Sequence, residues 1–139
     1  MALATFLQLL RPRTLDEQRQ HREYCEHVHA VSGRVRSIFD AWVAMREVEG
    51  NYARLANASA VNRWELMRLA KQSERVYAPR ALSDVQRETS QAVTASARAC
   101  QLLANGYRFH KSEAICDGQA LLVEAVQDLD NLTRLAESR

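Results

Sequence analysis

Seven apolar residues in the first half of the chain follow one another at alternating spacings of four and three. On an α-helix such positions lie on one face, and their repeat is the heptad pattern of helices that pack on other helices. The run therefore predicts a long helix with one face buried against another helix. We call these residues the first-helix seam: Tyr24, Val28, Val31, Val35, Ile38, Trp42 and Met45.

Composition extends this prediction to the whole chain. Only four glycines and two prolines occur in 139 residues, so there are few places where the backbone can turn sharply. The sequence is rich in Ala, Leu, Arg, Glu and Gln, which lose little conformational freedom in a helix. We therefore expect an all-α protein, a four-helix bundle with a long first helix and a short N-terminal apolar helix. Residues 1–13 form the apolar segment and 14–139 the bundle domain.

Helix start and stop signals divide the domain into four segments. Thr14-x-x-Glu17 and Ser83-x-x-Gln86 are capping-box patterns, which predict helix starts before the first and third segments. Gly50-Asn51 predicts the end of the first helix, and Asn105-Gly106 predicts the end of the third. The second helix is expected within 52–77, before Pro79, with a possible interruption at 57–62. The fourth is expected to begin near Ser112.

The third and fourth segments carry matching stripes. Small residues dominate the third stripe, which predicts a central helix whose neighbours approach closely. Gly118 falls on the fourth stripe, and Gly33 lies inside the first helix, where its cost in helix stability suggests a close neighbour. The third stripe is Leu82, Val85, Thr89, Ala92, Ser96, Ala99 and Leu103; the fourth is Ile115, Leu122, Ala125, Leu129, Leu132 and Ala136.

The N-terminal segment has its own apolar helical face, made by Leu3, Phe6, Leu7 and Leu10 and followed by Arg11-Pro12-Arg13. It is too short to span a membrane. It also lacks the basic start and small-residue cleavage site of a secretory signal. We expect this face to pack on the domain, with peripheral membrane contact or organellar targeting as alternatives.

Charge and cysteine content restrict the function classes. The 19 basic and 17 acidic residues give a net charge of +2 and are interspersed, whereas nucleic-acid binding favours a clustered basic surface. Three cysteines without CxxC spacing, Cys25, Cys100 and Cys116, fit free and mostly buried thiols in a reducing, intracellular compartment. The cytoplasm and an organelle remain equally open.

Residues suited to metal or phosphate chemistry occur in the first helix. His21, Cys25 and His29 share one face, but three ligands on a straight helix converge poorly on one ion, so no metal site is predicted. Glu26-x-x-His29 lacks the second such motif that a di-iron bundle requires. The segment His29-Ala-Val-Ser-Gly33 resembles that around the phosphorylated histidine of histidine phosphotransfer domains. Ser32, however, stands where that family usually has a basic residue.

One further patch suits nucleic acid. Tyr107, Arg108, Phe109 and Lys111 combine basic and aromatic side chains before the fourth helix, a pairing that can stack on bases and contact phosphates. No nucleophile elbow, phosphate loop or dinucleotide fingerprint occurs in the sequence.

The sequence thus favours a non-enzymatic structural or assembly subunit without cofactors. Such a protein would act through helix–helix contacts with a partner or a second copy. The alternative is a nucleic-acid-binding or packaging protein that uses its arginines and the 107–111 patch. Trp42 and Trp64 are expected as core or interface anchors. The predicted partner-binding residues are Leu3, Phe6, Leu7, Leu10, Tyr24, Val28, Val31, Val35, Ile38 and Trp42.

Overall fold

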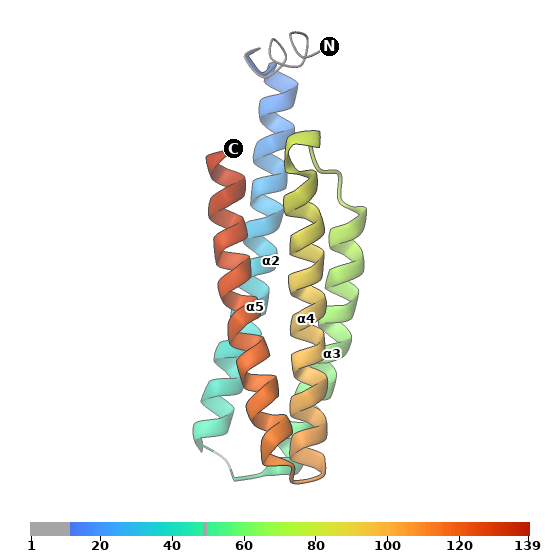
Figure 1. The fold of residues 1–139 in the computed structure, drawn as a ribbon, viewed down its shortest axis with the longest axis vertical. Helices are drawn as coiled ribbons and strands as arrows, with labels where there is room; N and C mark the ends of the chain where they lie inside the picture. Colours follow the sequence, from blue (N-terminus) through green and yellow to red (C-terminus); the bar gives the residue numbers. More distant parts are fainter. Residues whose placement is uncertain (1–11, 49) are drawn as a thin grey trace.

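The computed structural model describes residues 12–48 and 50–139, and within them the chain is an all-α four-helix bundle, as predicted. The helices are α2 (Leu15–Val48), α3 (Tyr52–Arg75), α4 (Ser83–Arg108) and α5 (Ser112–Ser138). A short 3₁₀ helix, η1 (Arg80–Leu82), precedes α4. Consecutive helices run antiparallel, and the N-terminal turns of α2 extend past the ends of α4 and α5 (Figure 1).

The four helices form a ring in cross-section. α4 packs against α3 on one side and α5 on the other, and α2 closes the ring between α5 and α3. α3 and α5 therefore lie diagonally across the bundle, as do α2 and α4 (Figure 1). This arrangement gives each helix one outer face that no other helix of the ring covers.

Side-chain hydrogen bonds cap or cover three helix ends, the start of α2 and both ends of α3. The Thr14 hydroxyl accepts from the Glu17 amide at 3.1 Å, and the Glu17 carboxylate accepts from the Thr14 amide at 3.2 Å, so the first capping box is confirmed. The Asn51 side chain caps α3 by accepting from the Arg54 amide. Ser83-x-x-Gln86 is not a capping box. The Gln86 amide instead donates to main-chain carbonyls at the end of α3, including Ser73 O at 3.2 Å and Val76 O.

The bundle core is built from the predicted stripes. In α2, the seam residues from Tyr24 to Trp42 are all buried, and Met45 is half-buried. All seven residues of the third stripe are buried, Leu82 in η1 and the other six along α4. The fourth stripe is buried along α5 except for the half-buried Ile115. Spacings of three and four therefore identified the inward faces of three helices correctly.

Glycines differ sharply in their surroundings. A Cβ at Gly118 would lie 2.9 Å from Leu103 Cγ and 3.0 Å from the Ala99 carbonyl, so this glycine lets α5 approach α4 closely. At Gly33 nothing lies within 4 Å, and the expected close neighbour is absent there. Gly106 does not end α4, which continues to Arg108. A Cβ there would lie 2.7 Å from Ile115 Cγ1, and the turn follows instead at His110, with a φ of 53°.

The apolar N-terminal residues Leu3, Phe6, Leu7 and Leu10 lie outside the described residues, so their packing stays a prediction. None of the helices in the described part is long and apolar enough to cross a membrane.

The second helix, α3, runs without interruption through 57–62.

Gly118→Ala and Gly33→Ala test the close approach of α4 and α5. Gly118→Ala should lower the free energy of unfolding by about 1–3 kcal/mol, because the new methyl group meets a main-chain carbonyl that cannot move aside. Gly33→Ala should raise it by about 0.5–1 kcal/mol through helix propensity alone. Urea unfolding measures both changes, and equal shifts for the two variants would contradict this packing.

Candidate interaction surfaces

The first-helix seam is part of the chain's own core, which corrects its assignment to a partner. Val28 and Val35 are completely buried, and Trp42 exposes 5% of its surface. In the folded chain these side chains already contact the other helices and cannot contact a partner. The correction covers Tyr24, Val28, Val31, Val35, Ile38 and Trp42.

The predicted 107–111 patch is also corrected, because Tyr107 belongs to the core. Trp42 Nε1 donates a hydrogen bond of 3.0 Å to the Tyr107 hydroxyl, and burial raises the pKa of that hydroxyl. The Tyr52 ring packs edge-on to Tyr107, with 5.2 Å between ring centroids. Arg108, Phe109 and Lys111 remain exposed around the turn. α4 is longer than expected, and this places Tyr107 on its inward face.

His21, Cys25 and His29 are not brought together at one point of the structure. His21 Nδ1 lies 3.7 Å from Cys25 Sγ, but His29 is exposed on the outside of α2. No group of three or more potential metal ligands occurs in the part of the chain that the structure describes. Burial lowers the pKa of His21 and raises that of Cys25. All three cysteines are free; Cys100 is buried and Cys116 is exposed.

The largest unexpected feature is on the outer face of α3. Trp64 exposes 64% of its surface and Val61 exposes 65%, one turn apart on the same face. Arg68, Lys71 and Arg75 continue this face toward the end of the helix at spacings of four, three and four. We call these five residues the α3 stripe. Trp42 is thus a core anchor, whereas Trp64 is not.

The charges of the α3 stripe are not neutralised within the described residues. Arg68, Lys71 and Arg75 make no ion pair there, and Arg63 lies over the Trp64 ring at 5.7 Å. The two acidic residues of α3 are on its flanks instead. Glu65 pairs with Arg34 of α2, and Glu74 accepts from the Ser90 hydroxyl of α4 at 3.1 Å. The α3 stripe is therefore apolar at its first two residues and basic over the other three.

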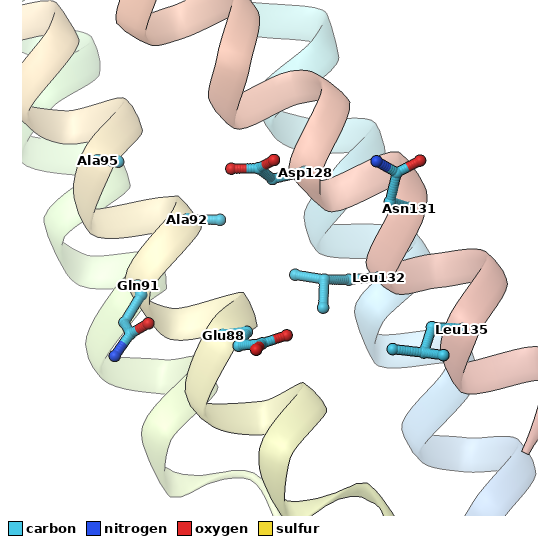
Figure 2. A pocket seen from close by; sticks show the side chains of 8 residues that line it. All are labelled: Glu88, Gln91, Ala92, Ala95, Asp128, Asn131, Leu132 and Leu135. Carbon is cyan, nitrogen blue, oxygen red and sulfur yellow. The ribbon is translucent and has the colours of Figure 1, made fainter.

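A groove of about 440 Å³ runs between α4 and α5. Figure 2 shows Glu88 of α4 and Asp128 of α5 extending toward the space between the helices, with Ala92 and Leu132 between them. Ala95 and Leu135 complete its apolar lining. None of the residues that line this groove is basic. The groove thus has an apolar floor and acidic edges, the reverse of the α3 stripe in charge.

Sequence reasoning missed both surfaces for a physical reason. The sequence leaves Trp64 open as a core or an interface anchor, and it assigns no face to Val61, because apolar residues of a helix usually belong to the core. A usable signal was present: Val61, Arg68 and Arg75 recur every seven residues, as do Trp64 and Lys71. That repeat marks one helical face, and its basic members indicate that this face is exposed.

Comparison with known proteins gives no relatives. No family model matches the chain, and neither a curated protein nor a solved structure matches it. Functional inference therefore rests on the surfaces described above.

Tyr107→Phe tests the buried hydrogen bond. It leaves the indole N–H of Trp42 without its acceptor, so the free energy of unfolding should fall by about 1–3 kcal/mol. Tyr77→Phe is the matched control, because Tyr77 is exposed and should change little. Chemical denaturation measures both, and an unchanged stability for Tyr107→Phe would contradict the assignment.

His27 should make stability fall in mild acid. Its Nε2 is buried without a hydrogen-bond partner, and burial lowers its pKa below the unfolded value of 6.5. The unfolded chain therefore binds a proton more readily, so stability is retained above that pH and declines as the pH drops below it. In thermal unfolding between pH 7 and pH 5, His27→Gln should lose less stability than the wild-type protein. His29→Gln, at an exposed histidine, is the control. An unchanged slope would count against a buried neutral imidazole.

Proposed function

We propose that this chain is a non-enzymatic assembly subunit that binds a protein partner through the α3 stripe. The observation that carries the proposal is the exposure of Trp64 beside Val61 on a helix whose other face is well packed. Tryptophan and arginine are the residues most enriched among those that dominate binding energy at protein interfaces. The α3 stripe offers both, in one row along one helix.

The apolar end of the stripe, Val61 and Trp64, can supply useful binding energy. Both side chains leave nearly two thirds of their surface in water. Covering them would contribute roughly 2–4 kcal/mol from apolar burial alone. That contribution is spread over one turn of helix, which is the spacing of anchors when a helix lies in a groove. A helix-in-groove contact thus fits the geometry of this face.

The charge of the stripe restricts the partner. If two α3 stripes packed together antiparallel about Trp64, Val61 of one copy would face Arg68 of the other. In a parallel pairing, Arg68 would face Arg68. Either arrangement places cations near each other or against an apolar side chain, which is unfavourable. The partner surface is therefore acidic, with an apolar floor that accepts an indole ring.

Nucleic acid is the second candidate, and the observation that favours it is the same face of α3. A row of cations beside an exposed aromatic ring can contact phosphates and stack on a base. The opposite corner of the bundle disfavours a long polyanion, because α5 carries six acidic residues and one basic residue. Binding to polynucleotide that weakens steeply with salt would support this candidate.

Trp64→Ala tests the proposed interface. It should weaken partner binding at least about tenfold, as expected for a central anchor, and should leave the unfolding transition nearly unchanged because the side chain is exposed. Tyr77→Ala is the matched control, since Tyr77 exposes 67% of its surface outside the stripe. Each variant is purified from the protein's own source, and native mass measurement shows how much of it retains the partner. Equal retention of the partner by both variants would refute the α3 stripe as the interface.

A further inference from the structure

We infer that the partner of the α3 stripe is the groove between α4 and α5 of a second copy of this chain. The inference rests on the proposed function and adds the identity of the bound surface. Both halves of the contact are present on one chain: a basic stripe with an apolar end, and an acidic groove with an apolar floor. Complementary charge of this kind favours one orientation and one partner over others.

The spacing of residues on the two surfaces matches in one direction. Along the α3 stripe, Val61, Trp64 and Arg68 follow at intervals of three and four. Along α5, read backwards, Leu135, Leu132 and Asp128 follow at the same intervals. An antiparallel α3 therefore places Val61 against Leu135, Trp64 against Leu132 and Arg68 against Asp128. These steps correspond to about 4.5 and 6 Å along each helix axis.

The opposite direction does not match. With α3 parallel to α5 and Trp64 again over Leu132, Arg68 would lie against Leu135 and Val61 near Asp128. That pairing places a cation on an apolar side chain and leaves a carboxylate without a partner, which costs binding energy. The antiparallel contact is therefore the one we assign.

The charge match continues for one turn beyond the groove. Lys71 follows Arg68 by three residues and the exposed Glu124 precedes Asp128 by four, so the two lie within one residue of the same register. The helices as a whole show the same contrast. α3 has five basic and two acidic residues, whereas α5 has six acidic and one basic. The turn of an antiparallel α3 that follows Arg68 thus meets a carboxylate on α5.

The positions of the two surfaces determine the type of assembly. α3 and α5 lie diagonally across the ring, so the stripe and the groove lie on different sides of the bundle (Figure 1). One partner cannot occupy both at once. The contact is therefore heterologous, and repeating it builds a ring or an open chain of copies. Association should rise with protein concentration and weaken with salt.

Charge exchange tests this contact directly on the full chain. Arg68→Glu and Asp128→Arg should each raise the dissociation constant of self-association at least about tenfold, because each places like charges together. The chain carrying both changes should recover most of the wild-type association, since the pair is restored with reversed sign. Sedimentation at several concentrations measures all four proteins. Arg108→Glu and Asp40→Arg, at exposed helical sites away from both surfaces, serve as controls.

The outcomes separate the inference from the proposed function. Recovery in the doubly changed chain supports the contact, and a doubly changed chain weaker than either single variant overturns it. A wild-type protein that stays monomeric at its highest concentration also overturns the contact. In that case the groove is open or is filled by another segment or protein. The proposed function fails separately, when Trp64→Ala leaves binding to every isolated partner unchanged.

Discussion

The close approach of α4 to both of its neighbours is the constraint on which the rest of the bundle depends. Small side chains make it possible: Thr89, Ala92, Ser96 and Ala99 are all buried along α4. Gly118 of α5 contributes from the other side, where a Cβ would collide with the Ala99 carbonyl. Small side chains on α4 also determine the shape of the surface between α4 and α5. Ala92 and Ala95 are too short to fill the space between α4 and α5, and the acidic groove results.

The sequence predicted those parts of the fold that follow from periodicity. Buried positions recur every three or four residues on a helix, so the inward faces of α2, α4 and α5 could be read directly. Periodicity does not predict hydrogen bonds between residues on different helices. The spacing of Gln86 from Ser83 is that of a capping residue, but its amide donates to carbonyls 10 to 13 residues away at the end of α3 and at its C-cap, Val76. Tyr107 seemed exposed because α4 was expected to end before it.

The candidate site was missed because apolar character alone does not tell which face a helix buries. α3 carries apolar residues around much of its circumference, including the buried Leu55 and Leu66 and the exposed Val61 and Trp64. Only the placement of α2 and α4 against α3 decides between these sets. Charge distinguishes the two sets, since a row of exposed cations marks the outer face of α3. α3 is mainly basic and α5 mainly acidic, so two diagonally opposite helices of the bundle carry opposite charge.

The concentration dependence of Trp64 exposure tests the central claim most directly. The chain has two tryptophans, of which Trp42 is buried in the core and Trp64 is in water in an isolated copy. Acrylamide quenches the fluorescence of an exposed indole far more than that of a buried one. We expect the quenchable fraction to fall as the wild-type protein is concentrated, and to return on dilution or addition of salt. A quenchable fraction that stays constant over the whole concentration range would contradict burial of Trp64 against a second copy.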